Sequence, residues 1–70
     1  MKITVKIEGM RCEHCSARVK KAMETFRGAN AEVDLRNKQA VVDTPEDISD
    51  KILEETINDL GFEFISASRS

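Results

Sequence analysis

Two halves of this 70-residue chain carry the same succession of patterns: an alternating segment, a stripe of apolar residues at helical spacing, and a second alternating segment. Ile3, Val5 and Ile7 alternate with polar residues, which is typical of a strand with one buried face. A helical stripe follows, formed by Cys15, Val19, Ala22, Met23 and Phe26. We expect Gly28 to end this helix as its left-handed C-cap.

The middle of the chain predicts a hairpin. Alternating apolar positions flank the polar turn 36–38, with Ala31, Val33 and Leu35 before it and Ala40 and Val42 after it. Two alternating runs separated by a short polar turn are typical of antiparallel strands.

A second helix is expected after the hairpin. Ser49 is a suitable N-cap, and Ile48 and Leu53 can pack across the first turn. Thr44, followed by a proline at the first helical position, is the competing start. The sequence therefore defines the first residue of this helix only to within several positions.

The complete order is strand, helix, strand, strand, helix, strand, with Gly61 ending the second helix and 62–65 forming the last short strand. Two βαβ halves with right-handed crossovers form an α+β, ferredoxin-like βαββαβ sandwich. Its four-stranded antiparallel sheet carries both helices on one face. In this arrangement the loop before the first helix and the loop after the second lie at the same end, so Phe62 is expected near the cysteines.

The length supports one small domain over 1–70 and leaves no room for an enclosed active-site cavity. Residues 67–70 are expected to form a flexible tail. The N-terminus lacks the apolar run of a secretory signal, and no segment reaches the roughly 20 apolar residues of a transmembrane helix. We therefore expect a cytoplasmic protein without membrane insertion, and Met1 with the polar end at Ser70 favours a free-standing protein over a fragment.

Positive charge is concentrated around the cysteines. Five basic and two acidic residues lie between Met10 and Gly28, a net charge of +3 in a chain whose total is −2. A basic helix face can be a solvated surface, or it can steer the protein toward an acidic partner. Nucleic acid is a poor partner, because the isoelectric point is near 5.3 and the chain has no aromatic platform.

Cys12 and Cys15 are the only cysteines, and His14 is the only histidine. In a reducing cytoplasm a C-x-x-C pair is more often metal-binding or catalytic than structural. Because Cys15 is expected to open the helix, with Arg11 and Arg18 close in sequence, both thiols are expected to be partly ionised. Soft thiolates favour Cu(I), while Zn(II) and other soft metals compete for them.

The number of available ligands distinguishes the kinds of metal site that a C-x-x-C pair can form. Structural zinc takes four ligands and iron–sulfur clusters normally take four cysteines, whereas this chain offers two cysteines and one histidine. A two-coordinate ion needs only the cysteine pair. Such a site stays open, so a partner's thiolates can take the ion by exchange, and copper beyond one equivalent is expected to link two copies into a homodimer with His14 at the junction.

A dithiol oxidoreductase is the alternative from a different class. Thioredoxin-type enzymes place a cis-proline opposite the C-x-x-C pair. The only proline here, Pro45, lies in the connection after the hairpin, so this alternative is less favoured.

The segment 9–23 resembles the signature of the heavy-metal-associated domain family. It reads Gly-Met-Arg-Cys-Glu-His-Cys and continues into a helix with Val19 and Ala22, as the family's Gly-Met-x-Cys-x-x-Cys motif does. The resemblance extends through 33–35, 40–42 and 60–62. It is closest to the free-standing bacterial copper chaperones.

The resemblance implies a role for each residue of the site. Cys12 and Cys15 would bind Cu(I), with Zn(II) or another soft metal as alternatives. Met10 would anchor the loop in the core, Phe62 would limit solvent access, and His14 would lie outside the ligands or bridge a dimer.

The same resemblance implies a non-enzymatic chaperone that delivers copper to a copper-transporting P-type ATPase or to its N-terminal metal-binding domain. A metal-binding regulatory module of a copper, zinc, cadmium or mercury transporter is the related alternative.

Overall fold

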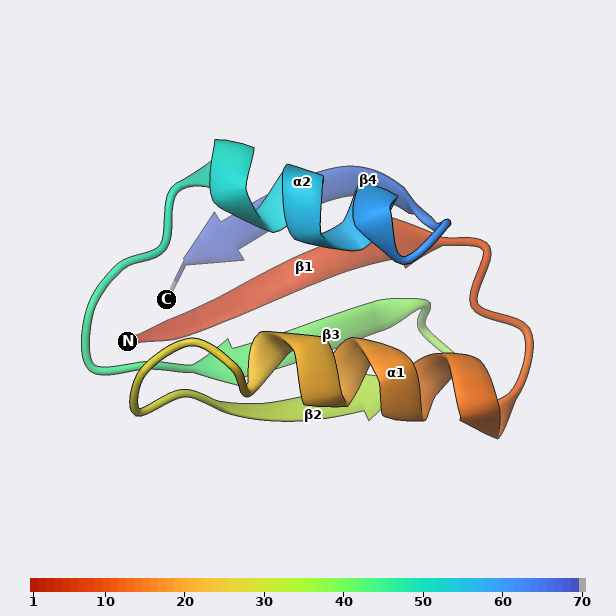
Figure 1. Ribbon diagram of the computed structural model, residues 1–70, viewed down its shortest axis with the longest axis horizontal. Helices are drawn as coiled ribbons and strands as arrows, with labels where there is room; N and C mark the ends of the chain where they lie inside the picture. Colours follow the sequence, from red (N-terminus) through yellow and green to blue (C-terminus); the bar gives the residue numbers. More distant parts are fainter. Residues whose placement is uncertain (70) are drawn as a thin grey trace.

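The computed structural model describes residues 1–69 and arranges them as one antiparallel sheet with two helices on one face (Figure 1). The elements in chain order are β1 (Lys2–Glu8), α1 (Glu13–Met23), β2 (Asn30–Asp34), β3 (Gln39–Asp43), α2 (Asp50–Asp59) and β4 (Glu63–Arg69). The strands lie in the order β2-β3-β1-β4, and each neighbouring pair is antiparallel. The predicted ferredoxin-like fold is confirmed. Neither helix of the described chain is long and apolar enough to cross a membrane.

The core lies between β1 and the two helices. Ile3, Val5 and Ile7 of β1 are at most 1% exposed, as the alternating pattern predicts. The helices cover them with four side chains that have no exposed surface: Val19 and Met23 from α1, and Leu53 and Ile57 from α2. Burying one such side chain contributes about 1.5–3 kcal/mol, so this layer dominates the stability of the domain.

The first helix is shorter than its apolar stripe predicts. It ends at Met23, and residues 24–28 continue through turns, so Gly28 is not its C-cap. The backbone N–H and the hydroxyl of Thr25 both donate to the carbonyl of Ala22, at 3.2 and 2.6 Å. That carbonyl would accept the N–H of Phe26 in a continuing helix. The local hydroxyl therefore competes with the helical hydrogen bond at this position.

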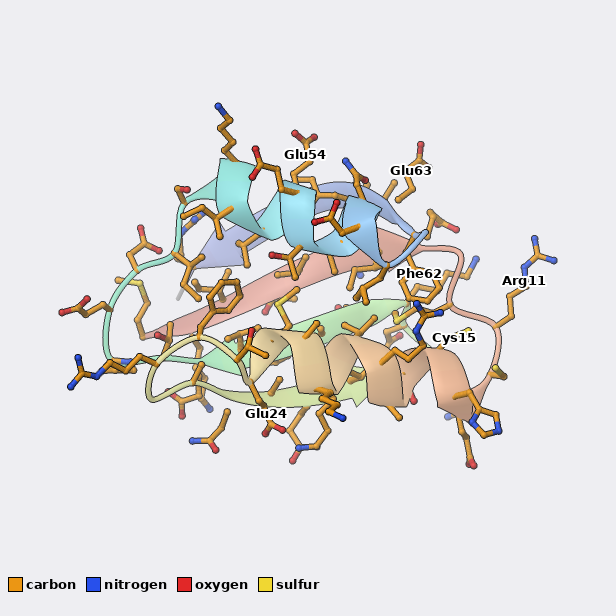
Figure 2. All side chains as sticks on the ribbon, in the orientation of Figure 1. Arg11, Cys15, Glu24, Glu54, Phe62 and Glu63 are labelled. Carbon is orange, nitrogen blue, oxygen red and sulfur yellow. The ribbon has the colours of Figure 1, made fainter. Side chains whose placement is uncertain are left out.

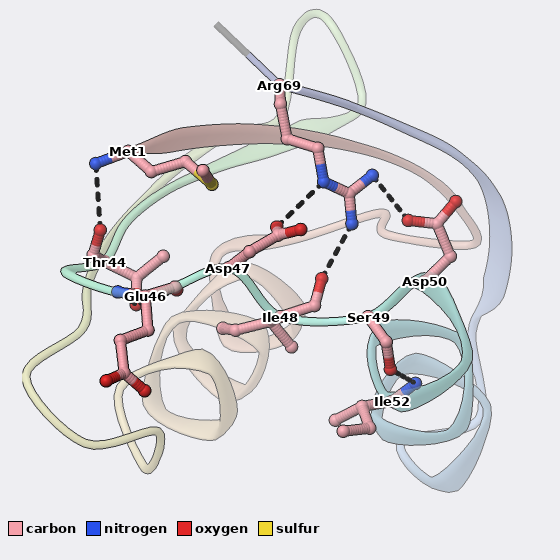
Figure 3. A network of polar contacts seen from close by, with 9 residues as sticks. All are labelled: Met1, Thr44, Glu46, Asp47, Ile48, Ser49, Asp50, Ile52 and Arg69. Atoms are coloured by element: carbon pink, nitrogen blue, oxygen red, sulfur yellow. Dashed lines mark hydrogen bonds and ion pairs between the residues drawn. The ribbon is translucent and has the colours of Figure 1, made fainter.

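The second helix begins where the Ser49 prediction places it. The Ser49 hydroxyl accepts the backbone N–H of Ile52 at 3.3 Å (Figure 3). Ile48 and Leu53, 8% and 0% exposed, are both in the core on either side of the cap. The competing start at Thr44 is wrong, because the Thr44 hydroxyl donates to a nearby loop carbonyl at 2.8 Å and belongs to the connection.

The last strand is longer than expected, and the prediction of a flexible tail over 67–70 is wrong for 67–69. These residues pair with β1 as part of β4, while Ser70 lies outside the described residues. A bulge shifts the register within β4, so Phe64 and Ala67, three residues apart rather than two, both lie opposite inward-facing positions of β1. The bulge interrupts the alternation of inward- and outward-facing residues in β4, so the sequence pattern predicted a shorter strand.

Arg69 fixes the end of β4 to the start of α2 (Figure 3). Its Nε donates to Asp47 at 2.9 Å, and an Nη donates to the carbonyl of Ile48 at 2.7 Å. The other Nη forms an ion pair with Asp50 at 2.5 Å. The partners of Arg69 lie about twenty positions earlier in the sequence. These contacts explain why the polar residues at the end of β4 belong to the sheet and do not form a flexible tail.

We predict that Leu53→Ala lowers the free energy of unfolding by about 2–5 kcal/mol, because it leaves a cavity under α2. Ile52 is the matched control on the same helix, since it is 46% exposed. Ile52→Ala should cost about 1 kcal/mol or less. Urea denaturation followed by far-ultraviolet circular dichroism measures both changes. Equal losses for the two variants would contradict this description of the core.

Candidate metal centre

The loop between β1 and α1 holds both cysteines at one end of the sheet. Gly9 leaves β1 with φ +103°, and Met10 then turns into the core, where it is 6% exposed. Cys12 is the N-cap of α1, and Cys15 lies inside the first turn instead of opening the helix as predicted. The N–H of Cys15 donates to the carbonyl of Cys12 at 3.1 Å. The first helical turn therefore sets the spacing of the two thiols.

The two thiol sulfurs lie 3.4 Å apart, with Cys12 exposed and Cys15 partly buried. At a metal–sulfur distance of about 2.3 Å, two thiolates on one ion lie about 3.8 Å apart at a tetrahedral angle and about 4.6 Å apart on a line. The sulfurs must therefore separate to admit an ion. The Cys12 sulfur makes no capping hydrogen bond to the helix, so its side chain can make this movement.

The fold lowers the pKa of the Cys15 thiol. The largest cause is a hydrogen bond from the backbone N–H of Arg11, followed by the hydrogen bond with the Cys12 side chain. Partial burial opposes the shift, and the charge of Arg18 adds a smaller effect that lowers the pKa. The direction agrees with the predicted thiolate character of Cys15, but the loop N–H contributes more than the predicted position at the helix start.

Phe62 lies at the cysteine end of the sheet, as the fold predicts (Figure 2). Gly61, with φ +90°, ends α2 by donating its N–H to Asn58 at 3.0 Å. The N–H of Phe62 donates to Ile57 at 3.2 Å, which completes a Schellman motif. The motif directs the ring toward the other loop, where a Cβ added to Gly9 would lie 3.4 Å from Cδ1 of Phe62. Gly9 and Gly61 both have a positive φ, so the backbone conformation rather than a lack of space favours glycine at these two positions.

Arg18 is a residue of the site that the sequence identified only as a nearby charge. Its guanidinium carbon lies 5.9 Å from the centroid of the Phe62 ring, within cation–π range. Arg18 follows Cys15 by three positions, so both lie on the same face of α1. The spacing between Cys15 and Arg18, combined with the predicted position of Phe62, could have predicted this contact from the sequence.

His14 is exposed in the first turn of α1, and its role stays a prediction. Within residues 1–69 no three His, Cys, Asp or Glu side chains are grouped so that they could hold a metal ion. The described part of the chain therefore offers the two cysteine sulfurs as candidate ligands and lacks a closed set of four.

The chain is similar in sequence to known metal-associated proteins. Residues 4–63 match the heavy-metal-associated domain, a range that includes the cysteine loop and Phe62. The copper chaperone CopZ of Staphylococcus haemolyticus is 38% identical over 61 residues, which cover 84% of this chain and 90% of that protein.

Two solved structures have the same fold. A CopZ metallochaperone superposes with a TM-score of 0.84 at 27% identity and covers 93% of this chain and 100% of its own. A copper binding domain from HMA7, a P-type ATPase, superposes with a TM-score of 0.79 at 32% identity and covers 97% of each chain. Proteins described as chaperones and as transporter domains are thus both similar to this chain.

We predict that Cys15 in the folded, metal-free protein is alkylated with a midpoint pH below that of the same thiol in an unfolded peptide of residues 9–18. The peptide keeps the neighbouring charges but loses the hydrogen bonds of the folded loop. Iodoacetamide labelling read by mass spectrometry gives both profiles. Coincident midpoints would contradict the assigned cause.

The lowered pKa of Cys15 also makes the free energy of unfolding depend on pH. Because the folded chain favours the ionised thiol, the stabilisation is complete above the ordinary cysteine pKa of about 8.5 and is lost as the pH falls through the folded-state pKa. Cys15→Ser should lack this dependence in urea denaturation. An identical pH dependence in the variant would contradict the link.

Proposed function

The chain belongs to the heavy-metal-associated domain family, and on this premise we propose that it is a cytoplasmic metallochaperone for Cu(I). Cys12 and Cys15 hold the ion and release it by thiolate exchange to a copper-transporting P-type ATPase. The observation that carries the proposal is the pair of sulfurs 3.4 Å apart, one of them exposed, at the end of the sheet. The ion is cargo and no substrate is transformed, so the protein is not an enzyme.

The donor set supports copper as the cargo. Thiolates are soft ligands that suit Cu(I), whereas Zn(II) in structural sites takes four ligands. Residues 1–69 supply the two thiolates without a third grouped ligand. The relatives described as copper chaperones and copper-binding domains support the same choice. Zn(II) or another soft metal remains the alternative cargo.

The unequal exposure of the thiols suggests an order of transfer. An acceptor thiolate adds to the bound ion, the exposed Cys12 thiolate leaves, and a second acceptor thiolate then displaces Cys15. Each step replaces one thiolate with another, so the oxidation state of copper does not change. Met10 anchors the loop from the core, while Phe62 limits solvent access and His14 lies outside the pair of ligands.

The acceptor is the copper-transporting ATPase or its N-terminal metal-binding domain. The similarity to a copper-binding domain of a P-type ATPase supports an acceptor built on the same fold. Arg11 and Arg18 are exposed and close in sequence to the cysteines, and Lys21 is exposed further along α1. They favour a partner with an acidic surface.

The similarity to that ATPase domain also favours a second candidate, a metal-binding regulatory module of a copper, zinc, cadmium or mercury transporter. The length of the complete reading frame separates this candidate from a free-standing chaperone. The dithiol oxidoreductase is less favoured, because Pro45 packs near Gly28 rather than opposite the cysteines. Rapid turnover in an insulin reduction assay would instead favour the oxidoreductase.

We predict that the reduced protein binds one equivalent of Cu(I) in competition with a Cu(I) chelator, and that Cys12→Ser or Cys15→Ser abolishes this binding. A single thiolate cannot match the chelator, so each variant should lose the ion. Circular dichroism of the metal-free variants controls for folding. Unchanged Cu(I) affinity in both variants would overturn the proposed site.

We further predict that Cu(I) beyond one equivalent links two molecules through facing Cys12 and Cys15 pairs. Size-exclusion chromatography across a copper titration should show a dimer that a thiol competitor dissociates. His14→Ala should reduce the dimer fraction without changing the binding of the first equivalent. Monomer at every copper ratio would refute the bridged dimer.

A further inference from the structure

The strand β2 lies at one edge of the described sheet, with β3 as its neighbour on one side only (Figure 1). The N–H of Ile7 in β1 donates to the carbonyl of Lys38 at 2.9 Å. Because bonded pairs alternate along an antiparallel ladder, the even-numbered residues of β3 bond to β1, and these are the residues opposite Ala31 and Val33. The backbone N–H and C=O groups of Ala31 and Val33 therefore point away from β3, toward the free edge.

One of these edge groups has a partner, and the contact is weak. The Glu24 carboxylate accepts the N–H of Ala31 at 3.4 Å and the ammonium of Lys20 at 2.9 Å. The first distance lies beyond the usual range of about 2.7–3.2 Å, and Lys20 keeps the carboxylate paired when the N–H is released. Within residues 1–69 no backbone hydrogen bond of Val33 is found outside the sheet. The edge is thus partly covered at Ala31 and uncovered at Val33.

A hollow of about 590 Å³ lies along this edge and carries negative charge. Three carboxylates line it, those of Glu13, Glu32 and Asp34, and none of the described residues that line it is basic. Glu32 and Asp34 lie on the face of the sheet without helices, because they alternate with Ala31 and Val33. A strand placed beside β2 would therefore meet carboxylates at every second position.

The same charges disfavour a second copy of this chain as the occupant of the edge. Full antiparallel overlap of two β2 strands places Glu32 opposite Glu32 of the second copy, and like charges directly opposite are destabilising. A cationic side chain at this position forms a favourable cross-strand pair instead. The other end of the edge has mixed charge, since Lys2 and Lys20 lie there beside Glu24. The pattern fits a strand with cations opposite Glu32 and Asp34 and an uncharged residue at its end.

We propose that the free edge of β2 docks an extended segment of a partner protein that carries lysine or arginine at alternate positions. The segment adds a fifth strand to the sheet by β-augmentation. Its backbone bonds to Ala31 and Val33, and its cations pair with Glu32 and Asp34. The side chains between the cations lie on the helix side of the sheet, next to the partly exposed Val33 and Leu35.

This docking surface goes beyond the proposed function, because the edge contains neither cysteine and needs no bound ion. β3 lies between β2 and β1, the strand that leads into the cysteine loop. The tests below use the reduced, metal-free chain. Loss of Cu(I) affinity would refute the chaperone and leave the docking surface unaffected, so the two can fail separately.

The probe is the acetylated and amidated pentapeptide Lys-Val-Lys-Val-Thr, whose antiparallel pairing places its lysines opposite Asp34 and Glu32. At saturation it should slow the amide hydrogen exchange of Val33, measured by NMR, at least about fivefold, because the added strand supplies an acceptor. The amide of Glu32, which bonds to β3, is the internal control and should not change. Unchanged exchange at Val33 would overturn the proposal. Protection of Val33 in concentrated protein without peptide would assign the edge to a second copy and also overturn it.

Two N-methylated peptides separate strand pairing from general charge attraction. Methylation of both valine nitrogens removes the donors that face β2 and should weaken binding at least about tenfold, since two hydrogen bonds are lost. Methylation of both lysine nitrogens, which point away from β2, keeps the charge and adds the same number of atoms. It should change the affinity by less than about twofold. Equal losses for the two peptides would contradict strand pairing.

The charge complementarity is tested by Glu32→Lys, which should weaken binding of the unmodified peptide about three- to tenfold at low ionic strength, because an attractive cross-strand pair becomes repulsive. Glu63→Lys is the matched control, since it makes the same change in net charge on β4, at the opposite edge of the sheet. It should leave the affinity within about twofold. Circular dichroism checks that both variants fold. Equal weakening in the two variants would overturn the assignment of the peptide to the β2 edge.

Discussion

The pairing of β1 with β4 is the constraint from which the geometry of the site follows. β1 is bonded to a strand on each side, and its register places Glu8 opposite Glu63. Because the two strands are antiparallel, the residue after β1 must lie beside the residue before β4. Gly9 and Phe62 therefore meet at the end of the sheet, and the cysteine loop starts from this contact. The buried inner face of β1 holds the register, since a slip of one residue would expose its apolar side chains.

The cysteine loop combines a firmly held backbone with one exposed thiol. Met10 is buried in the core and the first turn of α1 fixes the backbone around Cys12 and Cys15, while the Cys12 sulfur remains at the surface. A closed set of four ligands would hold a metal ion strongly and resist its transfer. In the proposed function, two thiolates, one of them with a lowered pKa, would bind a soft ion and leave it accessible to the thiolates of another protein. The architecture thus suits temporary binding better than permanent retention.

The sequence predicted the fold, the cysteine pair and the position of Phe62, because periodicity and chain order determine which loops share an end of the sheet. It failed where remote or competing polar contacts decide the outcome. The hydroxyl of Thr25 ends α1 before Gly28, and Arg69 orders the end of β4 through Asp47 and Asp50. The cation–π contact between Arg18 and Phe62 joins α1 to the loop after α2 and depends on side-chain positions that a linear pattern does not contain.

In the proposed site, the thiolates of Cys12 and Cys15 alone hold the transferable ion. X-ray absorption of the reduced protein loaded with less than one equivalent of Cu(I), at a concentration where it is monomeric, counts the ligands around the ion. We predict two sulfur neighbours at one short distance, without further ligands from the chain, and loss of this signature in Cys12→Ser. Four ligands around the ion, or nitrogen and oxygen neighbours in place of sulfur, would contradict the account.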